Sequence, residues 1–292
     1  MAITLEARAK INWALNITGV RPDGYHQLDM LMQTIALSDT LTLEKDAALA
    51  LYVDGAPAQD PERNLVVRAA RALNRAAGTD FGARMALLKR VPARAGLGGG
   101  SADCAAALVG LNRLWGLGLS MDELRGIGAT LGADVPFCLT GGLARVRGIG
   151  EVIDPVPGAP ELPLVLVTPG DGLSTAEVFR RWDGGYPAVP LDAAALERAV
   201  IARDLAAVDR LALNALNAPA LELMPDIADA MDALRDAGAE AVFMTGSGST
   251  VVGAFATPEA ARAAAGTVEG ARLTTTCTAA LWGPDDGPLA EV

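Results

Sequence analysis

The chain has 292 residues, of which 51% are hydrophobic and 20% charged, so it can bury a substantial core and is not of the disordered class. Its net charge of -11 argues against nucleic acid as the main partner, but does not exclude a local site for an anionic substrate. The single histidine, His26, excludes catalytic triads and zinc sites built on several histidines.

Three cysteines without a C-x-x-C pair, Cys104, Cys138 and Cys277, indicate structural thiols in the core of a protein from a reducing compartment. The first residues show no charged leader followed by an apolar block. No apolar run approaches the roughly 18 residues of a membrane span. We therefore expect a cytoplasmic protein with no membrane partner.

The first predicted element is a strand over residues 5–17, because these residues alternate with a period of two. The odd positions from Ala7 to Ile17 form one apolar face, and Lys10 and Asn12 share the other. The patterns that follow predict a turn at 19–24, apolar segments at 28–35 and 40–43, an irregular region at 46–62 and a helix at 64–77.

A glycine-rich stretch follows a strand-like run at 85–91 and leads into an Ala/Leu helix. Glycines at 96, 98, 99 and 100 let a ligand approach the backbone closely, and Ser101 is expected to cap the helix. Because a helix N-terminus attracts anions, the stretch predicts a phosphate site. It fits neither the dinucleotide-binding fingerprint nor the Walker A loop. A plain strand-to-helix turn stays the alternative from these residues alone.

The glycine-rich helix is expected to end at Gly116, and Ser120 with Glu123 predicts a capping box that opens the next helix. That helix should end near Gly132, so that Asp134 lies close to a break before Pro136. Four prolines between 155 and 163 predict a boundary between an N-terminal domain, 1–157, and a C-terminal domain, 158–292.

The second half of the chain predicts a strand, then helices, then a strand–strand–helix–strand run. Its first short helix should begin with a second capping box, Ser174 with Glu177. This order suggests a ferredoxin-like α+β layer. The expected elements are strands at 164–168, 241–244, 251–255 and 273–276, and helices at 175–182, 191–214 and 226–237 and after Thr257.

Three separated stretches resemble the motifs of the GHMP small-molecule kinases. Residues 92–102 resemble the P-x-x-x-G-L-G phosphate loop, 245–251 the third motif and 9–12 the first motif. Within the family, the stretches 9–12, 21–28, 64–70 and 131–137 are similar to members that phosphorylate a cytidine-diphosphate-linked methylerythritol. The resemblance implies an α+β fold with an N-terminal S5-like α/β domain and a C-terminal ferredoxin-like domain.

The resemblance also implies roles for individual residues. Asp134 would be the catalytic base and Lys10 the catalytic lysine, with ATP and Mg²⁺ as cofactors and the metal ligands left open. ATP would contact Asn64, Lys89, Pro92, Ala93, Arg94, Ala95, Gly96, Leu97, Gly98, Gly99, Gly100, Ser101 and Ala102. The substrate would contact Asn12, Tyr25, His26, Thr175, Phe179, Thr245 and Gly246.

The implied function is ATP-dependent phosphorylation of a hydroxyl of that substrate, in the non-mevalonate isoprenoid route. The implied partner is a small molecule with a cytidine diphosphate moiety, bound by a monomer or weak homodimer. Two alternatives stay open: another GHMP kinase, acting on homoserine, mevalonate or a sugar, and a non-catalytic ligand-binding relative. The presence of both Lys10 and Asp134 argues against the second.

Overall fold

The computed structural model describes residues 2–55, 61–186 and 189–279. Its first sheet is built around two long antiparallel strands, β1 and β2, that pair along almost their whole length. The other edge of β2 pairs with β4 at one end and with β5 at the other. The strands are β1 (Ala2–Val20), β2 (His26–Asp46), β3 (Leu49–Asp54), β4 (Gly82–Leu88), β5 (Leu143–Gly148) and β6 (Val152–Val156).

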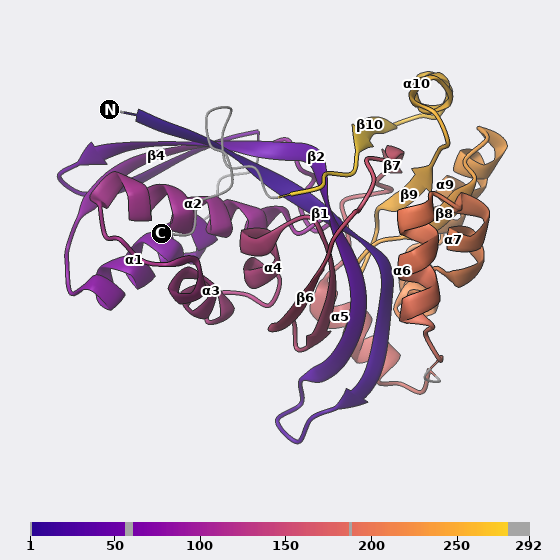
Figure 1. Ribbon diagram of the computed structural model, residues 1–292, viewed down its shortest axis with the longest axis horizontal. Coiled ribbons are helices and arrows are strands. Elements are labelled where there is room, and N and C mark those ends of the chain that lie inside the picture. Colours follow the sequence, from indigo (N-terminus) through magenta and orange to yellow (C-terminus); the bar gives the residue numbers. More distant parts are fainter. Residues whose placement is uncertain (1, 56–60, 187–188, 280–292) are drawn as a thin grey trace.

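Four helices lie together on one side of this sheet (Figure 1). They are α1 (Leu65–Ala77), α2 (Gly99–Trp115), α3 (Met121–Ala129) and α4 (Val135–Thr140), with a 3-10 turn, η1 (Pro61–Arg63), before α1. The helix boundaries at Gly78 and Gly116 are confirmed, and both glycines adopt the left-handed conformation that ends a helix. The capping box of Ser120 and Glu123 is also confirmed.

The second sheet has the strand order β10-β7-β9-β8, and all its pairs are antiparallel. This is the ferredoxin-like order predicted from the sequence. Its strands are β7 (Pro163–Val167), β8 (Ala241–Met244), β9 (Val251–Ala254) and β10 (Arg272–Thr275). The helices of this half are α5 (Thr175–Trp182), α6 (Ala193–Ala202), α7 (Leu205–Leu211), α8 (Asn217–Leu223), α9 (Asp226–Asp236) and α10 (Pro258–Thr267).

Irregular pairing divides the apolar residues of β1 between two cores. The register between β1 and β2 shifts after Arg8 and again after Asn12. Leu5, Ala7, Leu15 and Ile17 belong to a core that runs through both halves of the chain, whereas Ala9, Ile11 and Trp13 pack with the second sheet. The predicted single apolar face is therefore wrong, because bulges of this kind re-aim side chains.

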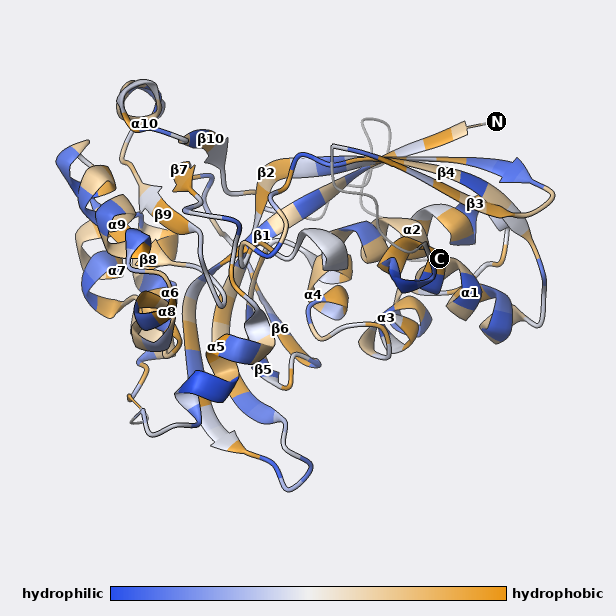
Figure 2. Cartoon of the chain, turned by 180° about the vertical axis from the view of Figure 1, so that it is seen from behind, coloured by the Kyte–Doolittle hydropathy of each residue, from blue (hydrophilic) through white to orange (hydrophobic). Residues whose placement is uncertain are grey.

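The two sheets are joined by this packing rather than by a linker alone. The rings of Trp13 in β1 and Phe243 in β8 lie 5.1 Å apart, centroid to centroid. The surface helix α5 differs from the buried α2: Figure 2 shows α5 largely in the hydrophilic colour, and Val178 is its one buried residue. The boundary proposed near residue 157 stays a prediction.

Two predicted helix caps are wrong. Helix α2 begins three residues earlier than expected, with Gly98 rather than Ser101 at the cap position, so that Ser101 lies inside the first turn. Ser174 does precede α5, but its side chain makes no capping hydrogen bond. The cap position of α2 has a φ of 69°, a conformation that favours glycine over serine.

Several predicted boundaries are also wrong. Residues 46–62 were expected to be irregular, but β3 occupies part of them, and 56–60 lie outside the described residues. The helix expected at 191–214 is broken at Arg203, which has a φ of 58°, and Asp204 caps the next helix. Val135 is helical despite the following Pro136, because proline is tolerated in a first helical turn. The strands β5 and β6, and helix α8, were not predicted.

The three cysteines are buried and unpaired, as predicted. Burial raises the pKa of the Cys104 thiol to about 12, so this side chain behaves as a small apolar group. Within the described parts of the chain, no helix has the length and apolar character needed to cross a bilayer.

Candidate active site

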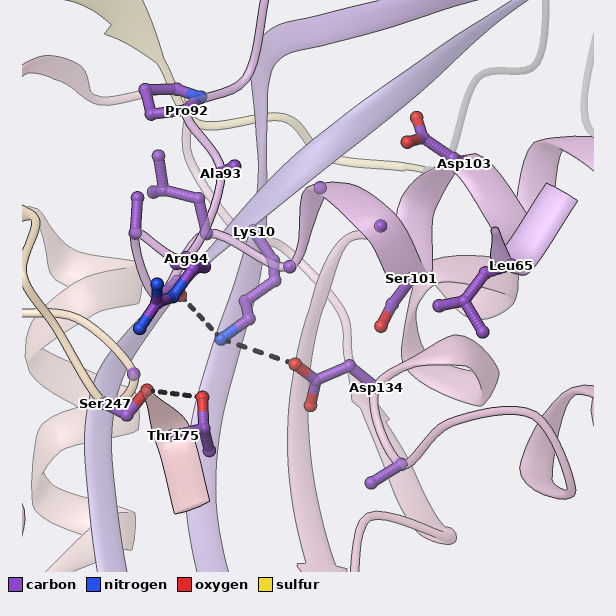
Figure 3. Close-up of a pocket in the computed structure, with 18 of the residues that line it drawn as sticks. Lys10, Leu65, Pro92, Ala93, Arg94, Ser101, Asp103, Asp134, Thr175 and Ser247 are labelled. Carbon is purple, nitrogen blue, oxygen red and sulfur yellow. Dashed lines mark hydrogen bonds and ion pairs between the residues drawn. The ribbon is translucent and has the colours of Figure 1, made fainter. Parts of the chain in front are cut away.

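A cleft with a volume of about 560 Å³ lies where the first motif, the glycine loop and the third motif come together. Its walls come from β1, from residues 92–101, from α5 and from the turn between β8 and β9. Figure 3 shows Lys10 in the middle of this cleft, with Asp134 facing it. Segments more than 200 residues apart in the sequence thus line one cavity.

The free edge of β1 holds these segments in place. The backbone N–H of Lys10 donates to the carbonyl of Leu97 at 3.0 Å. The next outward N–H, that of Asn12, donates to the Thr245 hydroxyl at 2.8 Å. Further along, the N–H of Leu15 donates to the Leu213 carbonyl at 2.8 Å. An edge strand needs partners for such groups, and here the functional loops supply them.

The two glycine motifs touch backbone to backbone. A Cβ atom built on Gly96 would lie 2.2 Å from the Thr245 carbonyl oxygen, and one on Gly246 would lie 2.6 Å from the Gly96 carbonyl oxygen. Neither distance is compatible with a side chain. Glycine at both positions is therefore required by this close approach, which fixes the glycine loop against the second sheet.

Lys10 is nearly buried, with 4% of its surface exposed. Its ammonium group donates to Asn12 Oδ1 at 2.6 Å and to the Gly96 carbonyl oxygen at 2.9 Å. A buried lysine is stable only with such partners. These two contacts orient the third N–H of the ammonium group toward Asp134.

Asp134 occupies the cap position of the short helix α4, and its side chain makes no capping hydrogen bond. Its Oδ2 lies 3.6 Å from Lys10 Nζ, and 32% of its side chain is exposed. A separation of 3.6 Å is an ion pair rather than a hydrogen bond. The carboxylate therefore keeps its lone pairs available to a group that enters the cleft.

The N-terminus of α2 opens into the same cleft. The backbone N–H of Ala102 bonds to the Gly98 carbonyl, so the N–H groups of Gly99, Gly100 and Ser101 precede the first intrahelical bond. The three residues line the cleft, and the first turn of α2 carries no acidic residue. This arrangement favours an anion.

Lys89 lies between two buried carboxylates. Its ammonium group bonds to Asp39 and, at 2.6 Å, to Asp103 Oδ2. Burial alone would lower the pKa of Lys89, but the two carboxylates outweigh it and raise the pKa. Asp39 also accepts the backbone N–H groups of Arg90 and Val91, at 2.5 and 2.8 Å. Asp39 is therefore the better satisfied carboxylate.

Asp103 is the less satisfied one. Its Oδ1 is buried without a hydrogen-bond partner among the described residues. Burial raises the pKa of Asp103 to about 7, and the attraction of Lys89 only partly opposes this. Asp103 lines the cleft and was not predicted from the sequence. The signal that could have identified it is a carboxylate on an otherwise apolar helix face.

His26 begins β2 and lies against α5. Its ring centroid is 4.7 Å from that of Phe179 and 5.7 Å from that of Trp182. Its Nε2 lies 2.7 Å from Asp183 Oδ1. Phe179 in turn lines the cleft. The four side chains thus form an aromatic cluster with one polar edge at the end of the cleft, where α5 closes it.

Most of the predicted site residues line the cleft. Thr175 does so with its hydroxyl 2.8 Å from the Ser247 hydroxyl. Tyr25, with 62% of its surface exposed, does not line it, and neither does His26 itself. Ala102 and Thr245 are fully buried behind the wall. Those that line it are Lys10, Asn12, Asn64, Lys89, Asp134, Thr175, Phe179, Gly246 and every residue from 92 to 101.

Asn64 has two roles: it lines the cleft, and its side chain caps α1 by accepting the Val66 N–H at 2.9 Å. Arg63, beside it, also lines the cleft and was not predicted. Arg63 was missed because it follows a region that was expected to be irregular, where no periodic pattern predicts which way a side chain points.

The raised pKa of Asp103 makes the stability of the folded chain depend on pH. Because its pKa is about 7 in the folded chain against 3.8 for the unperturbed group, the folded state binds the proton more tightly, and stability falls as the pH rises from about 4 to 7. We expect the melting temperature of Asp103→Asn, relative to that of the wild type, to be higher at pH 8 than at pH 5 by on the order of 2–5 °C. Thermal unfolding without ligand measures this difference. Asp122→Asn, at an exposed carboxylate, is the control, and its melting temperature should differ from that of the wild type by the same amount at both pH values. The same constant difference for Asp103→Asn would contradict the assignment.

Known proteins show which family this architecture belongs to. The chain is 46% identical to the 4-diphosphocytidyl-2-C-methyl-D-erythritol kinase of Pelotomaculum thermopropionicum, over 90% of this chain and 92% of that one. It is 45% identical to the kinase of the same name from Rhizobium johnstonii, over 93% and 90%. A crystal structure of 4-(cytidine 5'-diphospho)-2C-methyl-D-erythritol kinase, 35% identical, superposes with a TM-score of 0.81, covering 94% of this chain and 99% of that one.

More distant structures share the fold. A homoserine kinase from Cytophaga hutchinsonii superposes with a TM-score of 0.70 at 19% identity, covering 95% of each chain. Two family models also match: the GHMP kinases N terminal domain at residues 64–142 and the GHMP kinases C terminal domain at residues 194–271. The first match contains the glycine loop and Asp134, and the second lies in the ferredoxin-like half. The chain belongs to the GHMP kinase family.

Proposed function

We propose that the chain uses ATP to phosphorylate a hydroxyl group of 4-diphosphocytidyl-2-C-methyl-D-erythritol, in the non-mevalonate route to isoprenoids. The names of the relatives that match nearly the whole chain support this acceptor. The chemistry is supported above all by one observation: the Lys10 ammonium faces the Asp134 carboxylate at 3.6 Å in the cleft that the N-terminus of α2 enters.

In this proposal the N-terminus of α2 binds the ATP phosphates. The free N–H groups of Gly99, Gly100 and Ser101 donate to phosphate oxygens, and the helix dipole adds a favourable field. The apolar side chains of Val53, Leu65 and Leu87 line another part of the cleft and provide a surface for the adenine ring. Lys10 neutralises charge on the transferred phosphoryl group.

Asp134 accepts the proton of the acceptor hydroxyl. As the hydroxyl oxygen forms its bond to the γ-phosphorus, the bond from that phosphorus to the β,γ-bridging oxygen breaks, and ADP leaves with that electron pair. The proton ends on the Asp134 carboxylate and returns to solvent. Because Lys10 is held by Asn12 Oδ1 and Gly96, its charge stays in place during this transfer.

Mg²⁺ fits the site as an ion held mainly by the phosphates of ATP. No cluster of three or more His, Cys, Asp or Glu side chains is arranged around a metal position in the described parts of the chain. Mg²⁺ commonly takes only one or two protein oxygens besides phosphates and water. The Ser101 hydroxyl, which lines the cleft, would supply one of them. The ion would shield the negative charge of the phosphates.

The acceptor's cytosine is proposed to bind near His26 and Phe179. The two rings are already in contact, at 4.7 Å, and an aromatic face suits a pyrimidine base. His26 also offers a polar ring edge, whose Nε2 lies at Asp183. Tyr25 is exposed in the same turn, where a bound base would cover it.

A related kinase activity is the second candidate. Homoserine kinase and mevalonate kinase share the fold, at 19% and 18% identity, and the motifs 9–12, 92–102 and 245–251 do not separate the acceptors. The His26–Phe179 pair favours a nucleotide-linked acceptor over these small alcohols. The cytoplasmic location and the monomeric or weakly dimeric state stay predictions from the sequence.

An acceptor panel tests the function. Release of ADP from ATP is followed with 4-diphosphocytidyl-2-C-methyl-D-erythritol, homoserine, mevalonate and a hexose, each with Mg²⁺. We expect turnover with the first alone, because only it carries a base for the aromatic cluster. Turnover with a different alcohol would replace the proposed acceptor, and binding without turnover would identify a non-catalytic relative.

Removing the ion pair tests the catalytic roles. We expect Lys10→Ala and Asp134→Asn each to lower kcat by about 10²–10⁴-fold, because charge compensation or proton acceptance is lost. Lys45→Ala, at an exposed lysine of β2, is the control and should leave kcat unchanged. Circular dichroism verifies folding. Near-normal turnover in the two site variants would contradict their assignment.

Removing the histidine tests the cytosine pocket. We expect His26→Ala to raise the KM for the cytidylyl acceptor by about tenfold or more, since a stacking and hydrogen-bonding partner is lost. The KM for ATP, measured with the same enzyme, should stay within about twofold, inside the usual context-dependence of single contacts. An unchanged acceptor KM would place the base elsewhere.

A further inference from the structure

Four cationic side chains line the cleft: Lys10, Arg63, Lys89 and Arg94. The charges of two are already matched, since Lys10 faces Asp134 and Lys89 lies between Asp39 and Asp103. The two arginines form no ion pair within the described residues. A cleft that receives two polyphosphates needs positive charge that is not already compensated.

The backbone of Arg94 is held in an uncommon conformation. Its φ is 55°, in the left-handed region that costs a residue other than glycine free energy. Its carbonyl accepts the N–H of Leu173 at 3.0 Å. This bond ties Arg94 to the segment that leads into α5, so that its side chain starts between the glycine loop and the second half of the chain. The side chain is exposed and therefore reachable by a ligand.

The position of the guanidinium separates it from the predicted ATP phosphate site. In Figure 3, Arg94, Ser247 and Thr175 lie on one side of Lys10, whereas Ser101 and Asp103 of α2 lie on the other. The hydrogen bond of Arg94 to Leu173 and the bond between Thr175 and Ser247 place these segments at the same wall. The N-terminus of α2, by contrast, lies on the opposite side of Lys10.

We propose that the Arg94 side chain binds the diphosphate of the nucleotide-linked acceptor, an inference that rests on the function proposed above. The planar guanidinium donates two parallel N–H groups to phosphate oxygens. The hydroxyls of Thr175 and Ser247 lie at the same wall and offer further donors. The family resemblance implies that Arg94 contacts ATP as part of the glycine loop, whereas the position of its side chain assigns it to the other substrate.

The P-x-x-x-G-L-G pattern leaves the position of Arg94 open. The glycine loop needs only backbone groups to hold ATP, so the side chain at 94 is available for a separate task. Arg94 is thereby a specificity-determining residue, which distinguishes a diphosphate-bearing acceptor from a small alcohol without phosphate.

The test replaces Arg94 without straining the loop. Arg94→Gly suits the positive φ and removes the guanidinium alone. We expect it to raise the KM for 4-diphosphocytidyl-2-C-methyl-D-erythritol by about 10- to 100-fold, the effect of losing a charge-assisted hydrogen bond, with the KM for ATP unchanged. Arg94→Lys should recover part of the loss, because it restores the charge without the fork.

Two controls separate a diphosphate contact from other effects. Arg90→Ala removes an arginine whose exposed guanidinium bonds to Thr40 outside the cleft, and it should leave both KM values unchanged. Calorimetric binding of CDP and of cytidine, with wild type and Arg94→Gly, should show the loss for CDP only. Thermal unfolding verifies that the variants are folded.

The outcomes are distinct. An unchanged acceptor KM in Arg94→Gly, or an effect on the KM for ATP instead, overturns the inference while the proposed function stands. An equal loss for CDP and cytidine also overturns it, because the diphosphate is then not the group bound. If the wild-type enzyme neither binds CDP nor uses the cytidylyl acceptor, the proposed function itself fails.

Discussion

The site depends on the unpaired edge of one strand. The first strand β1 is covered on one side by β2, and its other edge offers N–H groups that must be satisfied. Lys10, Asn12 and Leu15 give theirs to Leu97, Thr245 and Leu213, from three distant segments. The hydrogen bonds that complete the strand are therefore the same ones that align the glycine loop and the third motif with the Lys10 side chain.

The two glycine motifs are needed for this alignment even when no ligand is bound. Gly96 and Gly246 meet with their backbones in contact, and the carbonyl of Gly96 also accepts a hydrogen bond from the Lys10 ammonium. The Gly96 peptide group thus contacts both the third motif and the cationic side chain. Packing alone therefore accounts for the glycines at positions 96 and 246.

The sequence predicted features whose cause is local, and missed those whose cause is distant. Gly78, Gly116 and the Ser120–Glu123 box end or begin helices through nearby atoms, and these were right. The ferredoxin-like order was also right. Ser101 failed as a cap because Gly98 takes the cap position of α2, and Ser174 failed because its side chain makes no capping hydrogen bond. Asp103 could not be linked to Lys89 and Asp39, since that cluster joins three elements. Family resemblance, rather than periodicity, identified Lys10 and Asp134.

The packing of β1 between two cores has a consequence for how ligands enter. Ile11 and Trp13 belong to the first sheet by hydrogen bonding, but to the second by contact with Phe243 and its neighbours. Separating the two sheets would expose these side chains to water, at a free-energy cost of about 1.5–3 kcal/mol for each. This free-energy cost opposes a hinge motion that would separate the two sheets, so we expect the sheets to move as one unit when a ligand enters or leaves the cleft.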